Sequence, residues 1–400
     1  MSDRDRELDL FFEQLVEGRL SRRQVLRRLG AAGLTMSSAG TFLAACGGVK
    51  GTDKGTPKPK SATHAKTKIT ELDFSNWPLY IDKKVLKNFE AKYGGKVKYT
   101  EEINDNEEFF GKVRQQLQQG RSLDRDIVVL TDWMAARWVR AGWVEAKDKK
   151  NIPNEKNLQP GLQHPKFDPN RSYTLPWQSG MTAIGYNRKK TGRKLDSVKD
   201  LFDPKFKGKV SFLSDPRDSA GLVAIGDGKK MDSVTLDDMM SAIDKIDKAN
   251  KSGQIRRFTG NDYTDDLAKG NLWVSVAYSG DLIQLQADNP DLKFVIPEEG
   301  GILWTDNMML PQKPPHPYAA ETMMNYVYDP KVAARIAAYV NYVSPVKGAK
   351  EELVKTDPKL GNDPLIFPSD KDRAKLQGYP ALSASDENKM VQAMQKVTGA

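Results

Sequence analysis

A tryptophan and an aspartate two positions apart, Trp304 and Asp306, form a pair of side chains that could act together on one ligand. They stand in residues 303–310, which we expect to form a strand. Successive side chains of a strand point to opposite faces, so residues i and i+2 share a face. An indole ring and a carboxylate would then reach the same ligand. The alternative interpretation is that Trp304 simply packs in a core.

Aromatic side chains also follow the first and third strands that we expect in the chain. Trp77 and Tyr80 come after the first strand, and Trp133 comes after the third, next to Asp132. Ligands of open α/β sheets bind outside the carboxyl ends of the strands. These positions are therefore candidates for a binding site, although Asp132 could equally cap the helix that follows it.

The residue types that most often carry catalysis or bind metals are few and scattered. The three histidines, His64, His164 and His316, lie far apart in the sequence, and the chain has one cysteine. We find no pattern typical of a catalytic triad or a zinc site, and no phosphate-binding loop, GxSxG or HExxH motif. We therefore expect a protein that is not an enzyme, with no catalytic residues, cofactor or metal. Hydrolysis by paired carboxylates at the cell surface is the alternative.

The amino-terminal segment has the features of an export signal. Arg22 and Arg23 form a twin-arginine pair, and residues 29–43 carry no charge. That run is shorter than the roughly 20 apolar residues of a transmembrane helix, which is typical of a signal peptide. It leads into Leu-Ala-Ala-Cys-Gly, which contains Cys46 and resembles a bacterial lipobox. We expect residues 1–45 to be a twin-arginine lipoprotein signal peptide.

Cys46 is the expected attachment point of a lipid. A thiol, unlike a hydroxyl, is nucleophilic enough at neutral pH to take a diacylglyceryl group as a thioether. Two acyl chains on one residue hold a protein stably on a membrane. The protein should therefore be anchored on the extracytoplasmic face of the cell membrane, in the periplasmic or extracellular space.

The net charge of +9 invites a nucleic-acid-binding interpretation, but the distribution of the charge argues against it. Residues 1–45 carry +1, residues 47–68 carry +5, and residues 69–400 carry only +3. The segment 46–68 is rich in Gly, Pro, Lys and Thr and has no apolar periodicity, which is typical of a flexible tether. We expect no nucleic-acid partner.

The first part of the body alternates expected strands and helices. Apolar patterns predict strands at 69–75, 96–101 and 126–130. Helices are expected to begin near Asp82, Glu107 and Asp132. A β-α-β-α-β series of this kind implies a parallel sheet with right-handed crossovers.

A second α/β region follows from about residue 181. Strands are expected at 184–187, 209–213, 273–278, 294–296 and 303–310, and helices at 237–250, 319–328 and 332–340. Residues 69–400 are too many for one compact core, so we expect two domains.

Several short segments resemble the spermidine/putrescine-binding proteins of ABC importers. The most specific is 297–306, Pro-Glu-Glu-Gly-Gly-Ile-Leu-Trp-Thr-Asp. The others are 76–80 (NWPLY), 167–170 (FDPN), 182–185 (TAIG), 270–272 (GNL) and 278–280 (YSG). They follow the family order across residues 69–345, which is most of the chain beyond the signal and tether.

The resemblance implies an α/β, two-lobed fold of the periplasmic-binding-protein type II. Each lobe would be a mixed sheet flanked by helices, with the ligand cleft at the hinge. Both lobes would be discontinuous, lobe 1 with 69–178 and 307–343, and lobe 2 with 179–306 and 344–400. The chain would cross between them near Ser179 and near Asn307, and a third time near Ser344.

The resemblance also implies a function. A monomeric binding lipoprotein of this type captures a polyamine of the spermidine/putrescine class between its lobes and delivers it to an ABC-type permease for import. The alternative is the same fold binding another small solute, such as another amine, a sugar or a metal.

Ligand-binding residues follow from the resemblance position by position. The aromatic ones are Trp77, Tyr80, Trp133, Tyr278, Trp304 and Tyr342, and the carboxylates are Asp306 and, less closely aligned, Asp215. The family often has an acidic residue in the first loop, where this chain has Pro78 and Leu79, and Asp132 and Asp281 are the carboxylates that could compensate. A polyamine needs carboxylates for its amines and aromatic walls for its methylenes.

Overall fold

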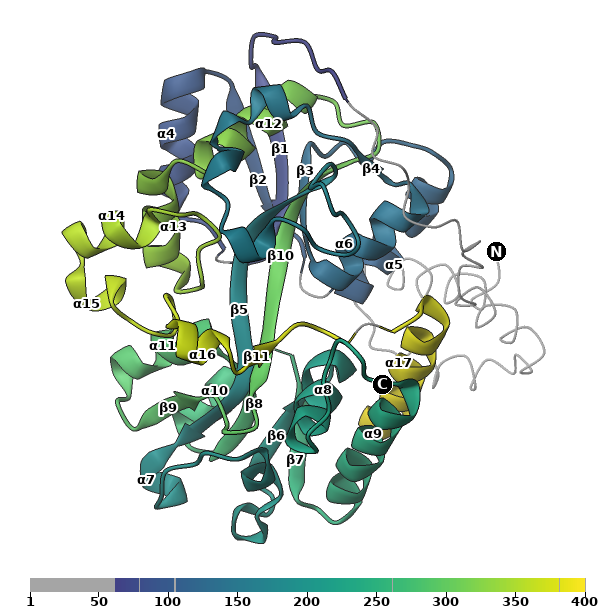
Figure 1. Cartoon of the computed structure of the whole chain (residues 1–400), viewed down its shortest axis with the longest axis vertical. Helices are drawn as coiled ribbons and strands as arrows, with labels where there is room; N and C mark the ends of the chain where they lie inside the picture. The colour runs from purple at the N-terminus through teal and green to yellow at the C-terminus, as the bar shows by residue number, and fades with distance from the viewer. Residues whose placement is uncertain (1–61, 79, 104–105, 261, 381, 400) are drawn as a thin grey trace, which may run out of the picture. The chain divides into compact units, whose positions relative to one another are not determined.

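Residues 62–78, 80–103, 106–260, 262–380 and 382–399 are described by the computed structural model of the chain (Figure 1). The expected signal peptide, with Arg22 and Arg23, and the expected lipidation site Cys46 lie outside these residues. Within these ranges, every helix is too short or too polar to cross a membrane.

The described residues contribute eleven strands to one mixed sheet. Its main path runs β2 (Lys96–Glu101), β1 (Glu71–Asn76), β3 (Ile127–Thr131), β10 (Gly301–Pro311), β5 (Thr174–Asn187), β8 (Val274–Tyr278), β6 (Val210–Leu213) and β7 (Ile255–Thr259). Three short strands flank this path: β4 (Val144–Glu145) and β11 (Leu376–Gln377) pair with β10, and β9 (Leu292–Val295) pairs with β5.

The first three strands are parallel to one another, and helices connect them as the sequence predicts. The helices of this region are α4 (Lys83–Tyr93), α5 (Asn106–Gln118) and α6 (Asp132–Ala141). The side chain of Asp82 caps the start of α4, and Gly94 ends it. Gly142 ends α6 in the left-handed conformation that favours glycine.

Two long antiparallel strands, β5 and β10, join the two ends of the sheet (Figure 1). All 14 residues of β5 are buried. Only its last four residues were expected to form a strand. The rest, which includes Pro176 and Gly180, has neither an apolar run nor a strict alternation, because both of its faces are covered.

The second half of the sheet contains β6, β7 and β8, which are parallel. Its helices are α7 (Arg188–Thr191), α8 (Pro216–Gly226), α9 (Leu236–Lys251), α10 (Tyr263–Lys269) and α11 (Ser279–Asp288). The sequence predicts α9 but not α8, since α8 is buried from Pro216 to Ile225 and so shows no amphipathic period. It also misses β7, whose two arginines break the apolar pattern.

The remaining helices lie after β10 or in short connections. They are α12 (Pro317–Val327), α13 (Pro330–Val340), α14 (Ala349–Thr356), α15 (Pro358–Gly361), α16 (Asp370–Arg373) and α17 (Ala384–Thr398). The 3₁₀ helices are η1 (Lys149–Asn151), η2 (Pro153–Asn157), η3 (Pro160–Leu162), η4 (Val198–Phe202) and η5 (Pro204–Phe206).

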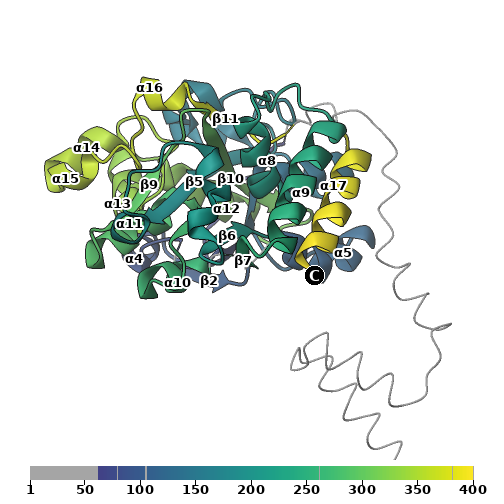
Figure 2. The same cartoon turned by 90° about the horizontal axis from the view of Figure 1, so that it is seen from below.

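Hydrophobic side chains gather at the two ends of the long strands. One core lies among β5–β9, α8 and α9 and takes in Met390 and Met394 of α17, which packs beside α9 (Figure 2). Two adjoining clusters lie around β1, β3 and α12 and around α5 and α6. These two clusters form the core of the first lobe, and the other core belongs to the second lobe.

The segment after α13 stays with the first lobe. Val346 and Ala349 belong to its core, and α14 packs against α13. We therefore propose that the chain returns to the second lobe only after Gly361, and not at Ser344.

The described end of the expected tether is fixed to the first lobe. His64 Nδ1 lies 2.6 Å from Oε1 of the buried Glu321, and Asn151 Nδ2 donates to the His64 carbonyl oxygen at 3.0 Å. Residues 62–68 were expected to be part of a flexible spacer. Their polar composition gives no sign of this attachment, which depends on partners far away in the sequence.

Candidate ligand-binding site

A cavity of about 490 Å³ lies between the carboxyl ends of strands from both lobes. Its aromatic lining consists of Trp77, Tyr80, Trp133, Tyr278, Trp304, Tyr342 and Tyr379, and its acidic lining of Asp215, Asp218, Asp281 and Asp306. None of the described residues that line it is a lysine, an arginine or a histidine.

The cavity brings together nine of the ten residues for which the sequence predicts a ligand contact. They are Trp77, Tyr80, Trp133, Asp215, Tyr278, Asp281, Trp304, Asp306 and Tyr342. Asp132 is the tenth, and it does not line the cavity. In the part of the chain that the structure describes, no group of three or more histidine, cysteine or acidic side chains could hold a metal ion.

Asp306 is buried at the first-lobe wall of the cavity. Its carboxylate accepts hydrogen bonds from the hydroxyls of Tyr80 at 2.8 Å and Thr131 at 2.7 Å. Asn106 Nδ2 in turn donates to the Thr131 hydroxyl at 2.9 Å. Burial raises the pKa of Asp306 to about 7, while the two hydroxyl donors act in the opposite direction.

Asp218 holds a similar position at the second-lobe wall. It accepts hydrogen bonds from Thr182 at 2.7 Å, Tyr278 at 3.0 Å and Tyr379 at 3.2 Å, all through hydroxyl groups. Burial and the neighbouring carboxylate of Asp215 raise the pKa of Asp218 well above its usual range. The site thus has a buried carboxylate on each lobe, and each is held by neutral donors.

Asp281, another of the predicted carboxylates, lies on the first turn of α11. Its oxygens accept hydrogen bonds from Tyr263 at 2.6 Å and from Tyr342 at 3.2 Å. Burial, together with the charge of Asp281, raises the pKa of both tyrosine hydroxyls well above 10. Both tyrosines therefore stay neutral donors at physiological pH.

Aromatic rings form a continuous wall along the cavity. Trp304 meets Tyr278 edge to face at 5.7 Å between ring centroids and Tyr342 at 5.3 Å. Tyr342 meets Tyr80 at 5.8 Å. Edge-to-face contacts of this kind fix ring orientation, and they leave ring faces for a ligand.

Two glycines make room for this wall. A Cβ atom on Gly180, which pairs with Trp304 across the sheet, would lie within 2.7 Å of three atoms of the indole. A Cβ atom on Gly280 would lie 2.6 Å from two ring atoms of Tyr342. Side chains at either position would push a ring out of the wall.

Asp132 lies on the other side of β10 from Asp306. Its carboxylate accepts a hydrogen bond from Asn307 Nδ2 at 2.6 Å. Asp306 and Asn307 are successive residues of β10, so their side chains point to opposite sides of the sheet, and the register of β5 and β10 shifts between them. Burial raises the pKa of Asp132 to about 6, opposed by the charge of Arg171. The idea that Asp132 replaces the acidic residue missing from the first loop is thus not supported by its position.

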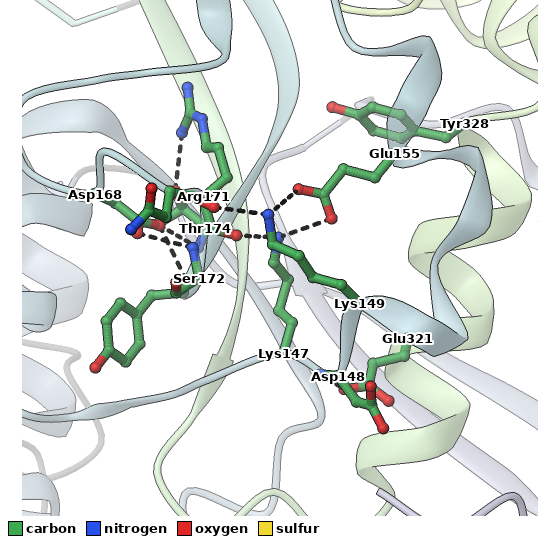
Figure 3. A network of polar contacts seen from close by, with 12 residues as sticks. Lys147, Asp148, Lys149, Glu155, Asp168, Arg171, Ser172, Thr174, Glu321 and Tyr328 are labelled. Carbon is green, nitrogen blue, oxygen red and sulfur yellow. Dashed lines mark hydrogen bonds and ion pairs between the residues drawn. The ribbon is translucent and has the colours of Figure 1, made fainter. Parts of the chain in front are cut away.

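A polar network supports the strand behind Asp306 (Figure 3). Arg171 donates to Asn307 Oδ1 and to Thr174 Oγ1, each at 2.8 Å. Asp168 accepts hydrogen bonds from the backbone N–H groups of Ser172 and Thr174. Lys147 donates to the Arg171 carbonyl oxygen at 2.7 Å, and burial lowers its pKa to about 8. These contacts hold the start of β5 and the bulge of β10.

Four polar lining residues that take part in the hydrogen bonds around Asp306 and Asp218 were not predicted from the sequence. They are Asn106, Thr131, Asp218 and Tyr379. Asp218 carries the clearest missed signal, since it follows Asp215 by three positions on a helix and so lies on the same face. Tyr379 comes from the carboxyl-terminal segment, which has no pattern that would place it near the cleft.

The model of one protein family, described as bacterial extracellular solute-binding protein, matches residues 84–365. The chain is 31% identical over 325 residues to the putrescine-binding periplasmic protein PotF of Escherichia coli K12, covering 76% of this chain and 85% of that protein. It is 26% identical over 309 residues to the spermidine/putrescine-binding periplasmic protein of the same organism, covering 77% and 86%.

Solved structures show the same fold. The spermidine/putrescine ABC transporter substrate-binding protein PotD of Streptococcus pneumoniae matches with a TM-score of 0.71 at 24% identity, over 82% of this chain and 99% of that one. The PotD lipoprotein of Treponema pallidum also gives 0.71, at 18% identity, over 81% and 99%. The expected two-lobed α/β fold of periplasmic binding proteins is therefore confirmed.

Proposed function

This chain belongs to the bacterial extracellular solute-binding proteins, and we propose that it captures a polyamine of the spermidine/putrescine class and delivers it to an ABC-type permease. The ligand would lie in the 490 Å³ cavity between the lobes. The curated relatives named above are binding proteins for spermidine and putrescine.

The observation that carries this proposal is the combination of buried carboxylates and aromatic rings in one cavity. Asp306 and Asp218 each receive only hydroxyl donors among the hydrogen bonds described above. Burying a carboxylate without a counter-charge is unfavourable. An ammonium group on the ligand would supply that charge, and the rings would pack against the methylenes and attract the cation.

The same cavity is poorly suited to the main alternatives. An anionic solute would meet four carboxylates and, among the described lining residues, no cationic group. A sugar gains little from paired buried charges. Another amine is the alternative that this lining favours, since amine length and carboxylate spacing decide which amine fits. We propose no catalytic role, because the relatives are named as binding proteins.

The test is the thermal stability of the purified protein with and without putrescine or spermidine. A ligand that binds only the native state stabilises it, by about 2.7 kcal/mol at 100 times its Kd. We expect both amines, or one of them, to raise the melting temperature, while 1,4-butanediol and succinate of similar length do not. No melting shift and no calorimetric binding at millimolar amine would refute the proposal.

We further propose that the protein is a monomer held on the extracytoplasmic face of the membrane through lipidated Cys46, after export directed by Arg22 and Arg23. A permease-serving protein gains from a short tether, because tethering raises its local concentration. Mass spectrometry of the mature protein should find a diacylglyceryl group on Cys46. Cys46→Ser should release the protein from the membrane fraction.

We also propose that β5 near Ser179 and β10 near Asn307 are the lobe crossings. Ser179 exchanges backbone hydrogen bonds with Val343, at 2.9 and 2.7 Å, so the segment next to Tyr342 lies against the crossing of β5. Rotation about these strands would close the cleft over the ligand.

A further inference from the structure

Arg217 of α8 stacks on the ring of Trp133 of α6. The guanidinium carbon lies 3.5 Å from the ring centroid, and both side chains are buried. Trp133 belongs to the core of the first lobe, whereas α8 packs in the core of the second. The contact therefore crosses the cleft, next to the cavity that Trp133 lines.

The polar partners of the Arg217 guanidinium lie at long distances for ion pairs or hydrogen bonds. Its Nη1 lies 3.4 Å from Asp215 Oδ1, and its Nε lies 4.0 Å from Glu387 Oε1. Neither Nε nor Nη2 donates a hydrogen bond to any described residue. The guanidinium thus lies over the face of the indole ring, and a desolvated cation over an aromatic face is a favourable arrangement.

Trp133 is placed differently from the other aromatic residues of the cavity. Trp304, Tyr278 and Tyr342 pack edge to face against one another. Trp133 instead meets two guanidinium groups, that of Arg217 and, at 5.3 Å, that of Arg137 on its own helix. A ring that is already stacked on a cation has less surface for a ligand amine.

We propose that Arg217 is a positioning residue that joins the lobes when the cleft closes, and that Trp133 serves this closure more than it serves ligand stacking. The same guanidinium lies beside Asp215, a carboxylate of the cavity wall. Closure would therefore set the position of Asp215 at the same time. This inference rests on the proposed function, since closure matters only for a protein that encloses a solute.

The energetic consequence concerns the balance between open and closed forms. A contact that exists only in the closed form raises the closed fraction, and the apparent affinity of an enclosed ligand scales with that fraction. Removing Arg217 should weaken binding although Arg217 does not line the cavity. Two variants that break the same contact should not add their effects.

The experiment compares Arg217→Met, Trp133→Leu and the double variant in the full chain. Calorimetry with putrescine and with spermidine gives the Kd, and small-angle scattering gives the radius of gyration with and without each amine. We expect each single variant to bind the amine about tenfold more weakly than wild type. The double variant should bind no more weakly than the weaker-binding single variant. All three variants should have a larger radius of gyration, as expected of a more open form.

The matched control is Arg137→Met, which removes a guanidinium near the same ring but from within the first lobe. It should leave the Kd and the radius of gyration unchanged. Arg217→Lys serves as a second variant if Arg217→Met does not unfold cooperatively, since it retains the charge and loses the planar stack.

The outcomes separate the two proposals. Wild-type protein that binds neither amine refutes the polyamine function. The scattering of the ligand-free variants then still tests whether the contact between Arg217 and Trp133 favours the closed form. If wild-type protein binds amine and the Arg217 variants have the same affinity and radius of gyration, only the proposed role of Arg217 in closure is overturned. Fully additive effects in the double variant would also overturn it.

Discussion

Asp306 shows how a single buried side chain can prefer a cationic ligand. The two hydroxyl donors, from Tyr80 and Thr131, orient both of its oxygens but bring no positive charge. The carboxylate is therefore desolvated and only partly compensated, which is why its pKa is raised to about 7. An ammonium group entering the cavity would complete the set of partners.

Replacing Asp306 by Asn should weaken amine binding strongly, because the shape is kept and the charge is lost. Hydrogen bonds to charged groups contribute about 1.5–3 kcal/mol, which corresponds to a roughly 10- to 100-fold higher Kd. Titration calorimetry with putrescine and spermidine measures the change.

Asp132→Asn is the matched comparison for this variant. Asp132 is a half-buried carboxylate near β10, but it faces Asn307 and does not line the cavity. We expect its Kd to stay within about threefold of wild type, well below the loss expected from a charge-assisted bond. Equal losses in the two variants would contradict the assignment of Asp306 as the ligand carboxylate.

The raised pKa of Asp306 also makes binding depend on pH. Near pH 7 its carboxyl is partly protonated in the ligand-free protein, and an ammonium ligand favours the ionised form. Binding should therefore release protons, and the affinity should rise between about pH 5 and pH 8. Calorimetry at pH 7 in buffers of different ionisation enthalpy counts the protons, and proton uptake would contradict this expectation.

Stability without ligand should follow the opposite trend. A carboxyl whose pKa is raised on folding contributes stability that is fully present below its unfolded pKa of 3.8 and is lost as the pH rises through about 7. A bound ammonium group supplies a counter-charge to the ionised carboxylate of Asp306 and so offsets this loss of stability. The melting shift caused by amine should accordingly be larger at pH 8 than at pH 5.

At the scale of residues, the sequence predicts those site positions that a strand or a strand end places locally. Trp304 and Asp306 share a face of β10, and Trp77 and Tyr80 follow β1, as expected. Tyr379 could not be found in this way, because its hydroxyl reaches Asp218 from 161 positions away. Asp132 was also expected at the site, but it accepts a hydrogen bond from Asn307 and does not line the cavity.

At the scale of elements, the close pairing of β5 and β10 positions the aromatic wall. Gly180 lies directly opposite Trp304 and leaves the space that the indole occupies. The network around Arg171 and Asp168 holds the start of β5 on the other side. A substitution in β5 should therefore change the geometry of the site even where it removes no ligand contact.

Gly180→Ala tests this connection between strand and site. The added methyl group would overlap the Trp304 ring, and overpacking of this kind costs typically about 1–3 kcal/mol of unfolding free energy. We expect a lower melting temperature and weaker amine binding, since Trp304 must move. Urea unfolding and calorimetry measure the two effects separately.

Gly111→Ala is the control for that variant. Gly111 lies within α5, and a Cβ atom there would meet nothing within 4 Å. Alanine should raise helix stability by roughly 0.5–1 kcal/mol and leave the affinity unchanged. A loss of binding in Gly111→Ala, or none in Gly180→Ala, would argue against a specific role for the β5–β10 contact.

The elements that the sequence predicts have an apolar alternation, an apolar helix face or a short continuous apolar run, as in the fully buried β3. The strands β1, β2 and β3 and the helices between them have clear apolar patterns, and the predicted order is confirmed. The first ten residues of β5 and residues 216–225 of α8 are buried, so their burial leaves no period to detect. A fully buried element without a short apolar run or an apolar period is therefore hard to predict from a single sequence.

At the scale of the whole molecule, the site depends on two lobes that each bring a carboxylate. Asp306 lies on β10 beside Tyr80, which belongs to the core of the first lobe, and Asp218 lies on α8 of the second lobe. The tether end is attached to the first lobe through His64 and Glu321. A membrane anchor would then hold the first lobe, and the second would move relative to it.

A length-matched monoamine tests whether both lobes take part in binding. We propose that putrescine gives one ammonium to Asp306 and the other to Asp218, whereas butylamine has only one to give. Losing one charge-assisted interaction should raise the Kd roughly 10- to 100-fold. Butylamine should also fail to close the cleft, because only a ligand that binds better to the closed form can shift the equilibrium toward it. Calorimetry and scattering with the two amines measure both effects, and equal affinity would confine recognition to a single lobe.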